Sequence, residues 1–175
     1  MNRLLDLSPD KLTPQQTEVF NRLVAGRGRI LGPYKIWIHS PVVADGMEHI
    51  GTYLNKKGSL SEREVEIGIL VIAKHWDADY VREAHIKIGK AAGLSQEIID
   101  AVLTGLDPKF TDPHERAVHR FATLLVGGAK MPDTEFAEIE KVIGRVGVAE
   151  VLVLLGYYTS VALGMKVHEV PIPQA

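Results

Sequence analysis

A glutamate and a histidine stand out because each occupies a helical pattern that is otherwise largely apolar along one side. Glu66 lies in the run EREVEIGILVIAKH, and His85 lies beside the apolar stripe of DYVREAHIKIGKA. Burying either side chain without a partner is costly, whereas a carboxylate and an imidazole together can hold and move a proton. The alternative is a glutamate on the exposed sliver of its helix and a hydrogen-bonded core histidine. The residue types alone leave both interpretations open.

Two helices joined by a tight corner would carry this pair. The first helix is apolar on most of its sides, which predicts a buried helix. The second has an inward stripe of small and branched residues. The residues that bound them are a capping box of Ser61 and Glu64, a cap at Asp77 or Asp79, and a stop at Gly93. We therefore expect a central helical hairpin over about residues 62–92.

The spacing of the pair along this hairpin argues against simple contact. His85 lies about five residues past the corner and Glu66 about ten before it, so at a rise of roughly 1.5 Å per residue they are offset by about 7 Å along the axis. A bridging water, a steep crossing angle or a bound substrate would have to fill that gap. Of direct and water-bridged contact, the offset favours the water-bridged form.

Composition excludes several classes of function. The chain has 175 residues, a net charge of −2 and no cysteine. Disulfides, thiol redox chemistry and cysteine-type zinc sites are therefore excluded. The only dense basic cluster is Arg27-Gly28-Arg29, which argues against nucleic-acid binding, because that requires many contacts to phosphate. We interpret the glycine-rich loop around that cluster as a connector, since it lacks the Gly-Lys-Ser/Thr of a phosphate loop.

The rest of the chain is also predicted to be helical. No segment alternates with a period of two between hairpin turns, and caps, prolines and glycines bound the helical runs. The expected helices outside the hairpin lie at 14–25, 41–57, 95–104, 113–126, 132–144 and 148–165, with a short turn or extended piece at 33–39 and an extended tail at 170–173. We predict one all-α domain spanning 1–175, a bundle of about seven helices.

Four blocks of this sequence, in order, resemble the carboxymuconolactone decarboxylase family, whose fold is shared with alkyl hydroperoxidase D. The blocks are GPYKIWIHSP at 32–41, LSEREVEIGILVIAKHWDADYVREAH at 60–85, AGLS at 92–95 and LLGYYTSVALGMKVHEVPIP at 154–173. The resemblance implies an alkyl hydroperoxidase D-like fold.

The peroxidase branch of that family uses a glutamate and the motif CxxCxxxH. Glu66 and His85 match the glutamate and the histidine, whereas Ala78 and Val81 stand at the cysteine positions. The resemblance therefore implies that the acid–base pair is retained without the redox pair. A family label of peroxiredoxin or alkylhydroperoxidase activity does not fit, because a thiol peroxidase needs a thiolate. The cysteine-free arrangement resembles the decarboxylase branch.

This resemblance implies an enzyme that removes carbon dioxide from a small carboxylated lactone or a related organic acid. Glu66 and His85 are the candidate catalytic residues, and no cofactor or metal is required because the lactone's conjugated system can accept the electrons. His39 precedes a helix N-terminus, where anions bind favourably. The candidate substrate-binding residues are His39, Trp37, Trp76 and Tyr80. Tyr157 and Tyr158 are more typical of core aromatics.

Two alternatives differ in class from a decarboxylase. One is a non-catalytic or ligand-binding member in which Glu66 and His85 form a structural network. The other is a metal-dependent enzyme using His39, Glu66 and His85, although no short ligand motif such as HExxH occurs.

The expected partners are an anionic small molecule and further copies of this chain. The apolar run Val151–Met165 is too short for a comfortable membrane span and indicates a core or interface helix. The resemblance implies trimers or hexamers. The first residues, MNRLLDLSPDKL, contain no apolar run typical of a signal peptide, so we expect a cytoplasmic protein that binds neither nucleic acid nor membrane.

Overall fold

The computed structural model describes residues 3–4, 8–30, 32–128 and 130–172, and this part of the chain contains helices and no strands. The elements are η1 (Pro9–Lys11), α1 (Pro14–Arg27), α2 (Gly32–Trp37), α3 (Pro41–Lys56), α4 (Glu62–His75), α5 (Asp79–Ala91), α6 (Gln96–Thr104), α7 (Pro113–Val126) and α8 (Asp133–Val167). The all-α prediction is confirmed, with eight α-helices among the described residues in place of about seven.

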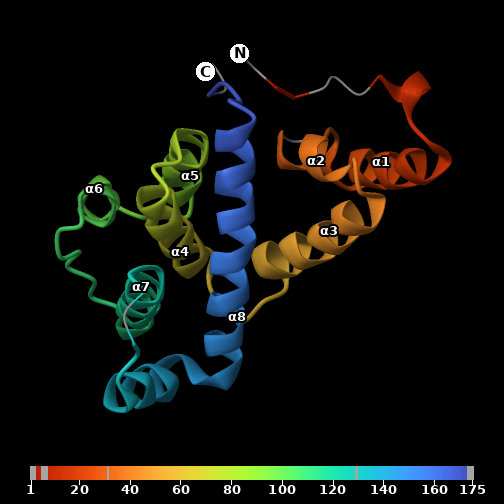
Figure 1. The fold of residues 1–175 in the computed structure, drawn as a ribbon. Coiled ribbons are helices and arrows are strands. Elements are labelled where there is room, and N and C mark those ends of the chain that lie inside the picture. The colour runs from red at the N-terminus through yellow and green to blue at the C-terminus, as the bar shows by residue number, and fades with distance from the viewer. Residues whose placement is uncertain (1–2, 5–7, 31, 129, 173–175) are drawn as a thin grey trace.

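Helix α8 lies at the centre of the molecule, between two groups of helices (Figure 1). Helices α4 to α7 lie on one side of it and α1 to α3 on the other. Helix α4 packs against α5, α6, α7 and α8. Ten consecutive residues of α4, from Glu64 to Ala73, are buried. The expectation of a buried first hairpin helix is therefore confirmed, because α4 has neighbours on all of its sides.

Close approach of α4 to α8 depends on a glycine. A Cβ atom on Gly68 would lie 2.8 Å from Cδ2 of Leu154, closer than real carbon atoms come. Leu154 is fully buried in the core, so little room exists for it to move. This contact limits how closely α4, the helix that contains Glu66, can pack against α8.

Most predicted helix boundaries are confirmed, and two are wrong. The capping box of Ser61 and Glu64 is present. Gly26 does not end α1; the stop is Gly28, whose φ of 72° is the left-handed conformation that glycine adopts without strain. The N-cap of α5 is Ala78, which makes no side-chain cap, in place of Asp77 or Asp79. The two helices expected at 132–144 and 148–165 are confirmed: α8 spans both, and its backbone leaves helical geometry between them at Gly144, with a φ of 68° and a ψ of 171°.

Helix α8 is long and apolar enough to cross a bilayer by length and composition, yet half of its most apolar window is buried inside the protein. It also carries the buried carboxylate of Glu150 and the bend at Gly144. These are properties of a core helix, as the sequence pattern indicated.

Candidate active site

Glu66 and His85 are in direct contact. Nδ1 of His85 lies 2.8 Å from Oε2 of Glu66 across the α4–α5 hairpin. Both side chains are nearly enclosed, with 13% of the histidine and 5% of the glutamate exposed. The expectation of a water-bridged pair is therefore wrong: the two side chains are in direct contact and line one cavity.

The expected offset of about 7 Å along the hairpin axis takes no account of the reach of the two side chains. A Cβ atom on Gly89 would lie 3.7 Å from the Cβ of Glu66, so Glu66 leaves its helix level with Gly89, one turn beyond His85. Because Gly89 has no side chain, nothing from α5 fills the space between the two helices there. The glutamate side chain and the imidazole together span the remaining offset of about one turn.

The contact determines how the imidazole can act. An ionised carboxylate only accepts hydrogen bonds, so with Glu66 ionised Nδ1 of His85 carries the donated proton. Nε2 of the same ring, and Oε1 of Glu66, have no partner among the residues that the structure describes. Nε2 is thus the ring atom available to give or take a proton, and Glu66 holds the ring in that state.

A cavity of about 500 Å³ contains this pair. It lies between α5, α8 and the segment that runs from the end of α1 into α2. The residues that line it are Arg29, Pro33, Tyr34, Asn55, Glu66, Tyr80, Val81, Ala84, His85, Ile88, Tyr157, Tyr158 and Val161. The volume suits a small organic molecule.

Aromatic side chains form one wall of this cavity. The ring of Tyr158 meets that of His85 edge to face, with centroids 5.1 Å apart. Tyr157 packs against Tyr158, and its hydroxyl lies 3.2 Å from that of Tyr34. Trp37 does not line the cavity; it is buried behind it, edge-on to Tyr34 and Tyr157. Trp37 therefore positions two lining tyrosines instead of contacting a bound molecule.

Tyr80 is the one predicted substrate-binding residue that lines the cavity. Burial raises the pKa of its phenol, and the nearby Arg29 guanidinium opposes that rise without cancelling it. The hydroxyl is therefore protonated near neutral pH and can donate a hydrogen bond.

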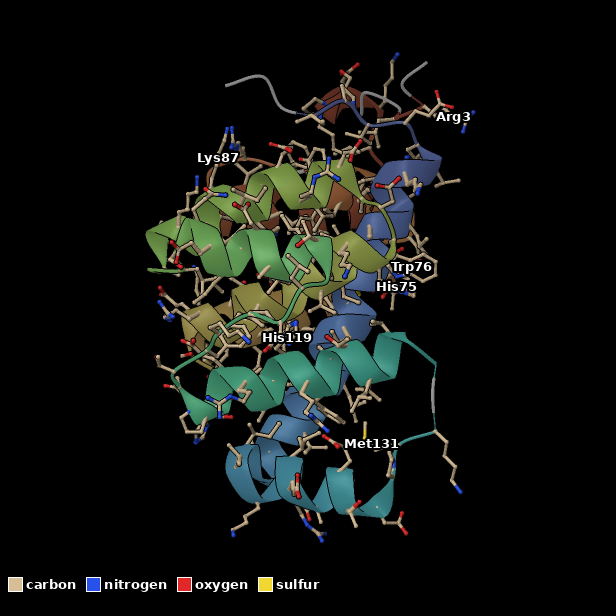
Figure 2. The ribbon with its side chains drawn as sticks, turned by 90° about the vertical axis from the view of Figure 1, so that its left-hand side faces the viewer. Arg3, His75, Trp76, Lys87, His119 and Met131 are labelled. Atoms are coloured by element: carbon tan, nitrogen blue, oxygen red, sulfur yellow. The ribbon has the colours of Figure 1, made fainter. Side chains whose placement is uncertain are left out.

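The other two predicted substrate-binding residues lie elsewhere. His39 is exposed after α2 and does not line the cavity. Trp76 donates from Nε1 to the hydroxyl of Thr159 at 3.2 Å and borders a separate hollow between α4, α7 and α8. Figure 2 shows it beside His75, at the corner of the hairpin. Within the described residues, no group of three or more His, Asp or Glu side chains could hold a metal ion.

Five polar or aromatic lining residues are not among the residues predicted for the site. The sequence predicts no role for Arg29 or Asn55, Tyr34 is only part of a matching block, and Tyr157 and Tyr158 are interpreted as core aromatics. The signal for Arg29 was the basic cluster at 27–29, which had been interpreted as a connector. Asn55 gave no signal, since it lies in an ordinary exposed turn of its helix pattern.

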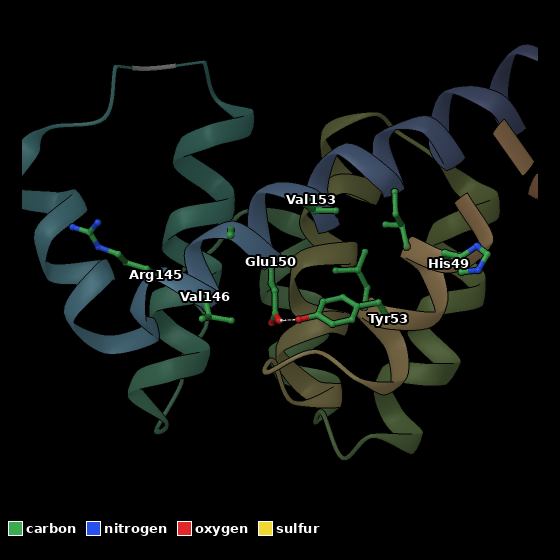
Figure 3. Close-up of a pocket in the computed structure, with 9 residues that line it drawn as sticks. His49, Tyr53, Arg145, Val146, Glu150 and Val153 are labelled. Atoms are coloured by element: carbon green, nitrogen blue, oxygen red, sulfur yellow. Dashed lines mark hydrogen bonds between the residues drawn. The ribbon is translucent and has the colours of Figure 1, made fainter. Parts of the chain in front are cut away.

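A larger groove of about 620 Å³ lies between α3 and α8 and is almost wholly apolar (Figure 3). Its one buried acid, Glu150, accepts a hydrogen bond from Tyr53 at 2.6 Å and others from Ser59 and Leu60. Burial raises the pKa of Glu150, but these hydrogen bonds outweigh burial and lower it overall. A carboxylate so fully engaged is structural, so the groove is not the candidate active site.

Comparison with solved structures defines the class of fold. The chain is similar to an uncharacterized peroxidase-related protein from Ralstonia eutropha JMP134, described as an alkylhydroperoxidase AhpD core, with a TM-score of 0.78, 14% identity, and coverage of 98% of this chain and 92% of that one. A peroxidase-related protein from Silicibacter sp. TM1040 gives a TM-score of 0.76 at 13% identity, covering 98% and 92%. A cysteine-to-alanine variant of the debrominase Bmp8 in complex with 2,3,4-tribromopyrrole gives 0.72 at 15%, covering 97% and 91%. At these identities the likeness establishes the AhpD-like fold.

A sequence match covers the central part of the chain. Residues 41–124, which include Glu66 and His85, match the model of the carboxymuconolactone decarboxylase family. Comparison with curated protein sequences gives no significant match. The positions of the missing cysteines are occupied by buried Ala78 and Val81, and Val81 lines the cavity.

Proposed function

We propose that this protein is a cofactor-independent decarboxylase that acts on a small carboxylated lactone or a related organic acid. The observation that carries the proposal is the direct Glu66–His85 hydrogen bond inside a cavity, with Nε2 of the histidine unpartnered among the described residues. That arrangement is suited to delivering one proton to a bound molecule. The absence of cysteine removes thiol redox chemistry from the candidates.

In the proposed reaction the bond between the carboxylate and its carbon breaks and carbon dioxide leaves. The electron pair of that bond moves into the conjugated lactone carbonyl, which gives a dienolate. His85 then transfers a proton from Nε2 to the carbon, and the ring is reprotonated from water. Glu66 stabilises the imidazolium form before transfer and keeps Nδ1 protonated throughout.

The lining of the cavity supports this chemistry. The tyrosines at 34, 157 and 158 and the apolar residues of α5 and α8 provide an aromatic and apolar surface for an unsaturated ring. A bound ring that displaces water from this surface would strengthen the electrostatic interactions made beside it. A developing dienolate held there would lie next to His85, the proposed proton donor.

Turnover of an unsaturated carboxylated lactone, followed by release of carbon dioxide, tests the proposal. Wild-type protein is compared with His85→Gln and with His114→Gln, a control in which the histidine is exposed at the start of α7. We expect His85→Gln to lower the rate by about 10²- to 10⁴-fold and His114→Gln to leave it unchanged. Equal rates for all three proteins would contradict the assignment.

A second candidate is a non-catalytic protein that binds a small flat molecule in the same cavity. The observation in its favour is the aromatic wall, which offers stacking surface whether or not a proton is transferred. Under this alternative, a bound lactone acid would be recovered unchanged after long incubation with the wild-type protein.

We also propose that the chain self-associates to a trimer or hexamer in the cytoplasm. Large apolar side chains stand exposed along the α3–α8 groove: Ile50, Tyr53, Val146 and Val153 have exposed fractions of 38%, 45%, 60% and 46%. A contiguous apolar surface of this kind is typical of a protein–protein contact. A second copy of this chain is the proposed occupant, because every copy carries this apolar surface on α3 and α8 and can bury it against a neighbour around a symmetry axis.

A further inference from the structure

A cation stands at the mouth of the Glu66–His85 cavity without an acidic partner. Arg29 lines the cavity, is exposed, and makes no ion pair or hydrogen bond within the described part of the chain. The other arginines whose side chains are described all have partners: Arg3, Arg22, Arg63, Arg82, Arg116, Arg120 and Arg145. Arg29 is thus the guanidinium left available to a bound molecule.

A second unpartnered donor lies beside it. The hydroxyl of Tyr80 makes no hydrogen bond among the described residues. It lies against the start of α2, where a Cβ on Gly32 would be 3.0 Å from it, three residues past Arg29. Arg29 and Tyr80 line the same cavity, and the hydroxyl of Tyr80 lies against Gly32, three residues after Arg29, so one ligand group could contact both side chains.

The two donors differ in kind from the rest of the cavity. The remaining lining is apolar or aromatic, apart from Asn55 and the Glu66–His85 pair. The amide of Asn55 donates to the carbonyl of Gly51 at 2.8 Å, so that donor is engaged within its own helix. A ligand anion therefore finds its charged contact at Arg29 and a neutral hydrogen bond at Tyr80.

We propose that Arg29 and Tyr80 form a carboxylate subsite, which selects planar organic acids and orients them with the ring toward His85. The planar fork of the guanidinium matches the two oxygens of a carboxylate, and the phenol supplies a third donor. This inference rests on the proposed function for its substrate class and replaces His39 as the expected anion contact. It assigns a specificity-determining role to the loop after α1.

Binding of a matched acid and amide tests the subsite without requiring turnover. Benzoate and benzamide have the same shape and differ in charge, and calorimetric titration gives the dissociation constant of each. We expect wild-type protein to bind benzoate at least about tenfold more tightly than benzamide, the lower end of what a charge-assisted contact provides. Arg29→Gln should abolish that preference, and Tyr80→Phe should reduce it about threefold to tenfold.

A control separates the subsite from a general effect of charge. Lys87→Gln removes one positive charge from an exposed position on α5 that does not line the cavity (Figure 2). It should keep the wild-type preference for benzoate. An equal loss in Lys87→Gln and Arg29→Gln would contradict the proposal, as would a wild-type protein that binds benzamide as tightly as benzoate. Tighter binding of phenyl phosphate than of benzoate through Arg29 would contradict the carboxylate assignment.

The same titration distinguishes failure of the subsite from failure of the proposed decarboxylation. His85→Gln should retain the preference for benzoate while losing turnover. If Arg29→Gln retains both the preference and full turnover, the subsite is wrong and the proton-transfer assignment stands. If His85→Gln retains turnover while Arg29→Gln loses the preference, the subsite stands and the decarboxylation mechanism is wrong.

Discussion

Replacing Glu150 by glutamine should destabilise the protein, because its carboxylate holds the loop that leads into α4. Oε2 accepts hydrogen bonds from the backbone and the hydroxyl of Ser59 at 2.8 and 2.7 Å and from the backbone of Leu60 at 3.3 Å. Those residues lie directly before the capping box that starts α4. The site residue Glu66 lies in the second turn of that helix, so the loop supports the element that carries it.

The size of the effect follows from these three contacts. A hydrogen bond to a charged group contributes about 1.5–3 kcal/mol and a neutral one about 0.5–1.5 kcal/mol, so each of the three bonds loses about 1 kcal/mol when the charge is removed. Relief from burying a charge offsets part of that loss. The pKa of Glu150 is lowered despite burial, so the hydrogen bonds stabilise the charged form by more than burial destabilises it. We expect a net loss of about 2–3 kcal/mol, or about 4–12 °C in Tm for a chain of this size.

Thermal unfolding at two pH values is the assay, with Glu18→Gln as the matched control on an exposed face of α1. Because the pKa of Glu150 is lowered in the folded protein, its contribution is complete above the unfolded value of about 4.3 and is lost as pH falls through the folded value. The Tm difference between wild type and Glu150→Gln should therefore be full near neutral pH and shrink in acid. A difference that is the same at about pH 7 and about pH 3 would refute the reasoning, as would a Glu18→Gln variant that is equally unstable.

Three further predictions concern redox activity, packing and assembly. Hydroperoxide reduction with a dithiol reductant should not exceed that of heat-inactivated protein, because no thiolate is available; turnover above that level would contradict it. Gly68→Ala should cost about 1–3 kcal/mol in unfolding free energy from its close approach to Leu154, whereas Gly46→Ala, with open space around it, should add up to about 1 kcal/mol; equal signs in denaturant titrations would refute this. Light scattering should report a trimer or hexamer for the wild-type protein. Val153→Asp should dissociate it and Leu106→Asp should not. A wild-type monomer would contradict the assembly proposal.

Local chemistry allowed most of the helices to be predicted. Caps such as Ser61, Ser95 and Asp112 act within a few residues of where they stand, so sequence spacing is enough to find them. The helix boundaries that were predicted wrongly lie where two candidate capping or stop residues stand close together in the sequence. Gly26 and Gly28 both could end α1, and only the backbone conformation of the second identifies it as the stop.

The site could be predicted in part. Glu66 and His85 were identified because they interrupt apolar patterns and match a family motif, but their direct contact depends on the closeness of α4 and α5, which brings Glu66 level with Gly89. The positions of Arg29, Trp37 and His39 relative to the cavity depend on how the segment between α1 and α3 folds back over α5 and α8. Contacts with distant helices decide how this segment packs. Its own sequence therefore shows which residues are aromatic or basic, but not which of them face the cavity.

The turnover and Tm of Glu66→Gln, measured on the same sample, test the central claim most directly. If Glu66 orients the imidazole of His85 for proton transfer, the glutamine should lower the rate per folded molecule by at least about tenfold, because the charge that stabilises the imidazolium is gone. The protein should remain folded, since glutamine fills the same space and can still accept from Nδ1. A Tm lowered by many degrees with the rate per folded molecule unchanged would show that the Glu66–His85 pair is structural, and would contradict the account.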